Sequence, residues 1–339
     1  MMADLVSILI PVYNARPWVA QAIESALAQT WPNKEVIVLD DGSTDGSIEV
    51  IQPYARRVRI ESAKNGGQNV SRNRLTAMSR GDWLIYLDAD DELAPDNVAQ
   101  KMKFAADAEA IYGSMDTVTF QGREAVRSEK RAAVDYLDPL KAAMWWAYPN
   151  TSSLAFRRTA LLAAGGWDES VKNCTDYALY LPMLLRGDRF RAAPDAWTVY
   201  RMWSATQAVN EAPIRKMTTR LRLMRTTVED MKRTGQLTPE REQAYFDAAL
   251  GGIRMLHLHD PAAASREHRV LRDWNPQLQP SPEVFSKVYL RSYHALGFAA
   301  AEKLAAGIRR IVPGWTRRKT ACVPRLALVS PASTEQPQV

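Results

Sequence analysis

The sequence is poor in cysteine and has no long hydrophobic run. Of its 339 residues only two are cysteine, Cys174 and Cys322, and no CxxC pair or cysteine–histidine cluster accompanies them. A disulfide framework and a zinc site are therefore excluded, and a reducing cytoplasm is the expected environment. No stretch approaches the roughly 18 apolar residues of a membrane-spanning helix. The N-terminus also lacks the basic and apolar regions of a signal peptide, so we expect a cytoplasmic protein.

Two common phosphate-binding signatures are missing as well. The sequence contains neither a GxGxxG run after a strand nor the GxxxxGK of a P-loop. Dehydrogenase and NTPase functions lose support for this reason. The aromatic residues are not interleaved with basic ones as in a single-strand binder, so we expect no nucleic-acid partner despite the basic pI of about 9.3.

Charge is divided unevenly along the chain. Residues 1–212 hold 23 Lys and Arg against 27 Asp and Glu, a balance of −4, whereas residues 213–339 hold 21 against 11, a balance of +10. This pattern predicts a mildly acidic catalytic body followed by a basic appendage that faces an anionic surface.

Short β-rich runs alternate with helical patterns in the first part of the chain. Apolar runs at 6–12, 35–39, 58–61 and 83–87 predict strands, and a helical face is formed by Val19, Ala22, Ile23, Ala26 and Leu27. Such alternation favours a doubly wound, mostly parallel sheet flanked by helices. From about residue 110 we expect two short strands (AIYGS and DTVTF), a charged loop at 123–131, and a helix at 176–186; beyond 212 the chain is helical.

Three polar clusters follow predicted strands, where the carboxyl ends of a parallel sheet bind ligands. Tyr13 and Asn14 end the first strand, in PVYN, and Asp40 and Asp41 end the second, in DDGSTD. A ring beside a carboxylate can hold a nucleotide base, but Asn14 is equally suited to capping the next helix. Two adjacent carboxylates at a strand end exceed what a cap requires, which favours a binding role for the second cluster.

The third and densest cluster is LDADD, in which Asp88, Asp90 and Asp91 follow an apolar strand. Carboxylates of one charge crowd together where a divalent cation binds, and Mg²⁺ commonly uses one or two of them with substrate phosphates. A solvated turn that caps a helix is the alternative, but it explains Asp88 poorly. Between the clusters, NGGQNVSRN offers glycines for close backbone approach at a helix N-terminus, with Arg72 or Arg74 near a bound diphosphate.

Taken together, PVYN, DDGSTD, NGGxxxxRN and LDADD resemble the inverting glycosyltransferases of family two, which have the GT-A fold. The resemblance covers about residues 5–205. It implies that Tyr13 and Asp40 hold the base, Arg72 contacts the nucleotide, Asp88 contacts the ribose or sugar, and Asp90 binds Mn²⁺ or Mg²⁺. The residues predicted to bind the nucleotide sugar are Pro11, Tyr13, Asn14, Asp40, Asp41, Gly67, Arg72, Asp88 and Ala89.

The family also implies a general base, and here the sequence departs from the usual pattern. Members carry a Glu-Asp pair after GGFDE, whereas this chain has GGWDES followed by Thr175 and Asp176. We predict Asp176 as the base, in its ionised form at a helix N-terminus. A second departure is Trp203, which stands where the family's YRxH motif has a histidine near the metal.

The acceptor side is predicted from aromatic rings. Trp145, Trp146 and Tyr148 are candidates to stack on a sugar, with Thr175 beside them, although an apolar lid or ordinary core explains the same rings. Residues 296–319 combine apolar and basic side chains, which suits a helix lying on the anionic inner leaflet or one packed on the catalytic domain.

The sequence therefore predicts a metal-dependent inverting glycosyltransferase that moves a hexosyl or hexosaminyl group from a UDP-sugar to a glycan or a lipid-linked acceptor. Expected domains are a GT-A catalytic domain at 1–212 (nucleotide half 1–115, acceptor half 116–212), a helical basic region at 213–325 and a disordered tail at 326–339. The alternatives are a catalytically idle nucleotide-sugar-binding scaffold and a sugar-phosphate nucleotidyltransferase. The QxxRW motif of processive synthases is absent, so addition of one or a few sugars is expected.

Overall fold

The computed structural model describes residues 4–122, 124–203 and 213–311, and these fall into two compact units. The first unit holds residues up to 135 together with 148–203. The second holds residues 136–147 together with 213–311. The domain boundaries inferred from the sequence stay predictions, and the predicted disordered tail lies outside the described residues.

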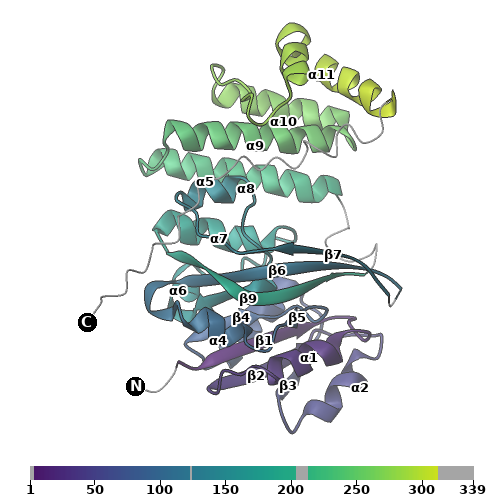
Figure 1. Ribbon diagram of the computed structural model, residues 1–339, viewed down its shortest axis with the longest axis vertical. Helices are drawn as coiled ribbons and strands as arrows, with labels where there is room; N and C mark the ends of the chain where they lie inside the picture. Colours follow the sequence, from purple (N-terminus) through teal and green to yellow (C-terminus); the bar gives the residue numbers. More distant parts are fainter. Residues whose placement is uncertain (1–3, 123, 204–212, 312–339) are drawn as a thin grey trace, which may run out of the picture. The chain divides into compact units, whose positions relative to one another are not determined.

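The first unit is an α/β unit built on one mixed sheet (Figure 1). Its strands are β1 (Val6–Val12), β2 (Lys34–Asp40), β3 (Arg59–Ser62), β4 (Trp83–Tyr86), β5 (Glu92–Leu93), β6 (Ala110–Gln121), β7 (Glu124–Arg131), β8 (Leu154–Arg157) and β9 (Phe190–Met202). Its helices are α1 (Val19–Leu27), α2 (Ser47–Ile51), α3 (Gln68–Met78), α4 (Asn97–Met102), α6 (Arg158–Ala163) and α7 (Thr175–Arg186). Single helical turns lie at Gln52–Tyr54, Ala105–Asp107 and Thr151–Ser153.

The N-terminal half of the sheet is parallel, in the order β3-β2-β1-β4. Strand β1 lies inside it and is almost wholly buried, as a run of apolar residues between two helix-covered faces should be. The register pairs Val12 with Asp40 and Leu9 with Tyr86. The segments that follow these strands therefore leave the sheet at one edge, which confirms the predicted fold class.

The second half of the sheet is mixed, and the order continues β8-β6-β9-β5. Strand β8 runs antiparallel to both β4 and β6, whereas β6 and β9 are parallel. Strand β5 pairs with the end of β9, with Glu92 opposite Val199. This pairing brings the segment that follows β4 next to residues 199–203, which are more than 100 positions away in the sequence.

The predicted charged loop at 123–131 is corrected by the structure. Residues 124–131 form β7, which pairs antiparallel with the second part of β6, and all eight of its residues are exposed. The two short strands expected before it are one continuous strand, β6. Because β7 has no buried face, its sequence carries no apolar alternation, and its backbone partner alone defines it as a strand.

The core of this unit forms between the sheet and its helices. The predicted face of α1 is buried there through Val19, Ala22, Ile23 and Ala26, and Leu27 packs partly against the same cluster. Residues Val6, Ile8 and Ile10 of β1 have no exposed surface. Burial of this size, at about 25 cal/mol per Å², is the dominant stabilising contribution.

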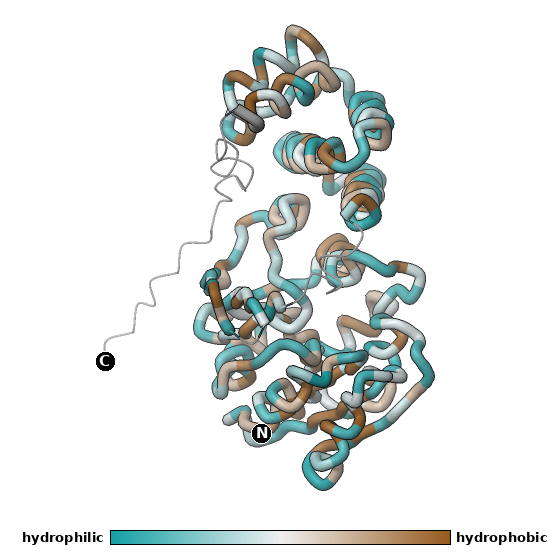
Figure 2. Tube along the Cα trace, turned by 90° about the vertical axis from the view of Figure 1, so that its right-hand side faces the viewer, coloured by the Kyte–Doolittle hydropathy of each residue, from teal (hydrophilic) through white to brown (hydrophobic). Residues whose placement is uncertain are grey.

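The second unit is helical, and hydrophobic and hydrophilic residues alternate along its helices (Figure 2). They are α5 (Pro139–Met144), α8 (Pro213–Arg233), α9 (Pro239–His257), α10 (Pro261–Trp274) and α11 (Lys287–Ile311), and α11 is broken at Gly297, whose φ is 75°. Helix α9 packs against α5, α8 and α10. In the described residues no helix has both the length and the apolar character needed to cross a membrane.

Three helices of this unit begin with the same two-residue pattern, a capping side chain followed by proline. Asp138, Thr238 and Asp260 each accept a hydrogen bond from the backbone N–H three residues on. Proline suits the first helical position because its missing N–H would have had no partner there. The pattern explains where α5, α9 and α10 begin.

Candidate active site

The loops after β1 and β2 are joined by side-chain to backbone hydrogen bonds. Asn14 has a left-handed backbone (φ 50°), which asparagine tolerates, and its Oδ1 accepts from the N–H of Thr44 at 2.8 Å. The backbone N–H of Asn14 donates in turn to Oγ of Ser43 at 3.0 Å. Asn14 thus shapes the loop between PVYN and DDGSTD, and the structure brings these two clusters together.

Asp41 holds the glycine pair that precedes α3. Its two carboxylate oxygens each accept a backbone N–H, one from Gly66 and one from Gly67, both at 2.9 Å. Asp41 is only 3% exposed, and Gly67 has a φ of 91°. Asp40, at the end of β2, is buried too, whereas the Tyr13 side chain is 55% exposed. The predicted base-binding pair therefore combines an open ring with a carboxylate at the sheet edge.

Arg72 lies at the centre of the strongest polar network. Its Nη2 donates to Oδ1 of Asp88 at 2.9 Å, and its Nη1 donates to Oγ1 of Thr175 at 3.1 Å. Its guanidinium lies 4.5 Å from the ring centroid of Trp167, and the side chain is 1% exposed. Arg72 therefore joins the end of β4 to the start of α7. In this structure it lies beneath Asp88 and does not present its guanidinium to solvent, where a nucleotide would contact it.

Asp90 is held from the end of β9. The indole N–H of Trp203 donates to Oδ2 of Asp90 at 2.9 Å, and Nη1 of Arg201 donates to the Asp90 carbonyl at 3.0 Å. Arg201 also forms an ion pair with Glu92. Asp88 and Asp90 are half-buried, while Ala89 between them is buried.

The third carboxylate of LDADD is fully buried. Asp91 accepts from the backbone N–H of Arg201 at 3.1 Å and from Nδ2 of Asn150 at 3.3 Å. Burial, with the nearby charges of Asp90 and Asp88, raises the pKa of Asp91 well above its usual range. Asp91 therefore has a structural role in the turn, because it has no exposed surface that a ligand could contact.

Tyr200 lies among the acidic residues of the site. Burial raises the pKa of its phenol, and the charges of Asp91, Asp88, Asp90 and Asp176 raise it further. The phenol of Tyr200 therefore stays protonated and can donate a hydrogen bond near these acidic residues. Tyr180 on α7 has its pKa raised in the same way, by burial first and then by Asp176.

Asp176 occupies the first turn of α7, where a carboxylate interacts favourably with the helix dipole. It is half-buried, and one of its oxygens accepts the N–H of Tyr177 at 2.9 Å. The preceding residue, Thr175, is the one that Arg72 contacts. Asp176 and Asp88 are therefore connected through two hydrogen bonds and one peptide unit.

The predicted acceptor rings separate into two groups. Tyr148 is 4% exposed and packs edge-on against Tyr112, Tyr180 and Phe190, so it offers no open face to a sugar. Trp145 and Trp146 belong to the second unit, where the guanidinium of Arg220 lies 4.5 Å from the Trp146 ring centroid.

Residues 200, 201 and 203 were not assigned to the site from the sequence. Trp203 stood out only as a missing histidine, and Arg201 only as part of YRxH. The signal available was position, because Tyr200 and Arg201 lie at the end of a long strand and Trp203 directly follows it. The contacts of Arg201 and Trp203 with Asp90 and Asp91 depend on the β5–β9 pairing, which leaves no local pattern in the sequence.

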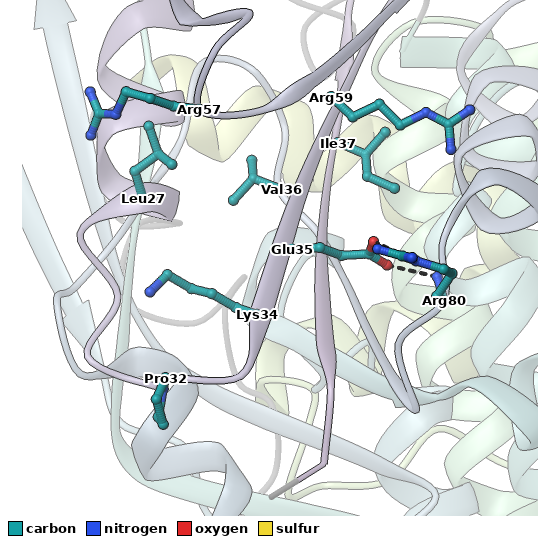
Figure 3. A pocket seen from close by; sticks show the side chains of 9 residues that line it. All are labelled: Leu27, Pro32, Lys34, Glu35, Val36, Ile37, Arg57, Arg59 and Arg80. Atoms are coloured by element: carbon teal, nitrogen blue, oxygen red, sulfur yellow. Dashed lines mark hydrogen bonds and ion pairs between the residues drawn. The ribbon is translucent and has the colours of Figure 1, made fainter.

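A surface cavity of about 690 Å³ lies at the opposite end of the sheet. It surrounds the first residues of β2 and is lined by Lys34, Glu35, Val36, Ile37, Arg57, Arg59 and Arg80 among others. Glu35 points to Arg80, whose backbone N–H donates to it at 2.7 Å (Figure 3). The cations are paired or bonded to backbone oxygens, and no aspartate of the site reaches this end. We therefore place the chemistry at the aspartates rather than in this cavity.

Comparison with known proteins shows what this arrangement is similar to. Residues 7–165 match the profile of Glycosyl transferase family 2. Chondroitin synthase of Escherichia coli is 33% identical over 189 residues, which are 53% of this chain and 26% of that protein. An uncharacterised glycosyltransferase of Bacillus subtilis, EpsJ, is 28% identical over 220 residues, 59% of this chain and 62% of that protein. The chain thus spans less than two thirds of these curated relatives.

The fold also has a solved counterpart. The crystal structure of S. aureus TarS 1-349 in complex with UDP-GlcNAc superposes with a TM-score of 0.65, at 16% identity, over 90% of this chain and 92% of that one. At this identity the likeness shows a shared fold, the GT-A type that the motifs predicted.

Proposed function

Residues 7–165 form a Glycosyl transferase family 2 domain, and on this premise we propose that the protein transfers a sugar, with inversion, from a UDP-sugar to a hydroxyl group of a glycan or lipid-linked acceptor. One observation carries the proposal. Arg72 bonds both to Asp88, at the end of β4, and to Thr175, the neighbour of Asp176. A carboxylate suited to the donor and a carboxylate suited to deprotonation are thereby held in one network.

The donor would lie along the carboxyl ends of β1, β2 and β4. Tyr13 follows β1, and Asp40 is paired with Val12 at the end of β2, so ring and carboxylate are neighbours across two strands. There the ring would stack on the base and Asp40 would accept its N–H. Asp41 keeps Gly66 and Gly67 in place, which lets the backbone approach the diphosphate closely.

The residues present fit a hard divalent cation, Mn²⁺ or Mg²⁺. Asp88 and Asp90 supply half-buried carboxylate oxygens two positions apart, the ligand type such cations prefer. The described residues contain no group of three His, Cys, Asp or Glu side chains that would form a complete protein cage. A cation held by Asp90 would therefore take its other ligands from the donor diphosphate and water. When bound, it would supply positive charge that stabilises the departing nucleoside diphosphate.

Asp176 is the proposed general base. Its place in the first turn of α7 favours the ionised form, which can accept the proton of the acceptor hydroxyl as that oxygen attacks the anomeric carbon. Attack from the face opposite the leaving diphosphate inverts the configuration at that carbon. Tyr200, whose phenol stays protonated because burial and the charges of nearby aspartates raise its pKa, would be available to donate a hydrogen bond to a sugar oxygen.

The choice of UDP and of a surface glycan rests on the relatives. TarS has been crystallised with UDP and with UDP-GlcNAc, and other relatives include chondroitin synthase and a putative teichuronic acid glycosyltransferase of Bacillus subtilis. We extend to this chain a UDP-sugar donor and a glycan acceptor, used at the cytoplasmic face of the membrane.

A thermal-shift panel tests the donor half of the proposal. UDP, GDP, dTDP and CDP sugars would be added with Mn²⁺, Mg²⁺ or EDTA, and we expect a metal-dependent rise in Tm with a UDP-sugar. The variant Asp90→Ala should lose the metal-dependent part of that rise. A wild type that responds to no donor would contradict the proposal, and binding without turnover would favour the idle scaffold.

The variant Asp176→Asn tests the base. We expect donor binding to be kept and transfer to fall by roughly 10²-fold or more, because the amide cannot accept the proton. The measurement is UDP release in the presence of acceptor, beside a thermal shift with the donor. Asp188→Asn, just beyond the C-terminal end of α7, is the matched control. Near-normal turnover of Asp176→Asn would remove Asp176 as the base.

A further inference from the structure

The indole of Trp203 has a specific polar contact with the residue proposed to bind metal. Its N–H donates to Oδ2 of Asp90 at 2.9 Å. An indole N–H is a donor only and has no lone pair with which to ligate a cation. Trp203 stands where the family-two glycosyltransferases that this sequence resembles have a histidine. Its indole therefore occupies an oxygen of the Asp90 carboxylate and supplies no ligand of its own.

The ring of Trp203 is held by further aromatic contacts. Its centroid lies 6.2 Å from that of Trp18, and Trp18 in turn lies 4.9 Å from Phe120. Trp18 is 7% exposed, so this group of rings is anchored on the core side. The guanidinium of Arg201 lies 4.9 Å from the Trp18 ring centroid, on the same cluster. The direction of the indole N–H is thus set by packing.

Arg201 fixes the backbone of the same aspartate. Nη1 of Arg201 donates to the Asp90 carbonyl, while its backbone N–H donates to Asp91. The end of β9 consequently holds the main chain of Asp90 through Arg201 and its carboxylate through Trp203. Asp90 is oriented before any ligand arrives.

From this geometry we propose that Trp203 is a positioning residue for Asp90 and makes cation binding depend on the nucleotide. With Oδ2 engaged by the indole and no imidazole present, the protein alone binds a divalent cation weakly. The cation is held once a diphosphate supplies further oxygens, while Trp203 keeps Asp90 turned toward it. The inference rests on the proposed function, because it takes Asp90 as the cation ligand.

The test uses Mn²⁺ and UDP as probes with the full chain. Mn²⁺ binding without nucleotide would be followed by the loss of the free-ion electron paramagnetic resonance signal. Relative to the wild type, Trp203→His should bind Mn²⁺ about tenfold more tightly, because a second protein ligand is created. Trp203→Phe keeps the ring but loses the N–H, so UDP affinity in Mn²⁺ should fall by about tenfold while UDP affinity in EDTA is unchanged.

Trp31→Phe is the matched control, because it removes another indole hydrogen bond, to the carbonyl of Asp4. It should change neither Mn²⁺ nor UDP binding. The inference is overturned if Trp203→His gains no Mn²⁺ affinity, or if Trp203→Phe loses UDP affinity equally in Mn²⁺ and EDTA. A wild type that binds no UDP at all would contradict the proposed function instead, and Mn²⁺ binding by Trp203→His would then decide the inference alone.

Discussion

At the scale of single residues, the buried guanidinium of Arg72 changes the role inferred from its motif. A nucleotide contact was predicted, but both Nη atoms are engaged by Asp88 and Thr175 and the side chain is 1% exposed. A buried charge costs free energy unless it is paired and hydrogen-bonded. Thr175 stands where the resembling family has a carboxylate, and its hydroxyl therefore supplies a hydrogen-bond acceptor that the buried guanidinium of Arg72 needs.

Removal of that partner should be measurable. Thr175→Val keeps the shape but leaves a buried N–H of Arg72 without an acceptor, at a cost of about 1–3 kcal/mol. We expect a lower Tm and turnover reduced by about tenfold, since Asp88 and Asp176 lose their connection. Thr175→Ser should restore both, because its hydroxyl remains. Equal behaviour of the valine and serine variants would argue against the network.

Lys101 offers a residue-scale test of stability against pH. It is fully buried on α4, its Nζ donates to Asn97 at 2.8 Å, and burial lowers its pKa to about 7. Between pH 7 and 10.5 the unfolded chain binds the proton and the folded one does not, so stability rises with pH in that window. Below pH 7 both states are protonated and the full penalty applies.

Lys101→Met should abolish this rise. At pH 7 the variant should gain stability on the order of 4 kcal/mol, less about 1 kcal/mol for the acceptor left on Asn97. Denaturant unfolding at several pH values, with exposed Lys103→Met as control, measures the difference. A wild type and a Lys101→Met variant with parallel pH profiles would show that Lys101 is charged and solvated in the folded protein.

At the scale of elements, the sequence predicted what depends on neighbours along the chain. The run at 6–12 and the helical face from Val19 to Leu27 were found because burial on a sheet or a helix leaves a local pattern. The same logic placed Asn14, Asp40 and Asp88 at one edge, because parallel strands end together.

What the sequence concealed depends on partners far away in the chain. Strand β7 is exposed on both faces, so only pairing with β6 reveals it. The hydrogen bonds from Arg201 and Trp203 to Asp90 depend on the pairing of Glu92 with Val199, which no local sequence pattern predicts. The burial of Arg72 and of Tyr148 likewise follows from packing between separate elements.

The repeated cap-proline starts of the second unit give an element-scale prediction. Asp260→Ala removes the side chain that accepts from Ala263 and should cost about 1 kcal/mol. Asp138→Ala should cost more, because Asp138 also accepts from Nε of Arg241 at 2.8 Å. Thermal unfolding followed by far-ultraviolet circular dichroism gives the order, with exposed Asp273→Ala as control. A larger loss for Asp260→Ala than for Asp138→Ala would contradict it.

At the scale of the whole molecule, the uneven charge along the chain predicts that the basic C-terminal region contacts an anionic membrane surface, where a lipid-linked acceptor would lie. Of the region 296–319 proposed to contact the inner leaflet, residues 312–319 lie outside those described. Within the rest, Leu296 is 59% and Leu304 44% exposed, beside exposed Lys303. Exposed apolar and basic side chains together suit an anionic interface.

Liposome sedimentation tests this contact. The double variant Leu296→Ser, Leu304→Ser should pellet less with anionic vesicles than the wild type does, whereas both proteins should stay in solution with neutral vesicles. Val126→Ser, exposed on β7, is the control. An unchanged pelleted fraction for the double variant would mean that these leucines do not enter the interface.

The second unit includes residues 136–147, which the gene encodes between β7 and β8 of the first. Helix α5 in this segment packs on α9, with Leu140, Ala142 and Met144 buried. A chain cut before α8 would leave that apolar face uncovered. Recombination between related genes could therefore exchange the C-terminal helices without loss of this packing only if residues 136–147 were exchanged together with them. The two stretches are thus expected to evolve as one inherited block, although more than 60 residues separate them.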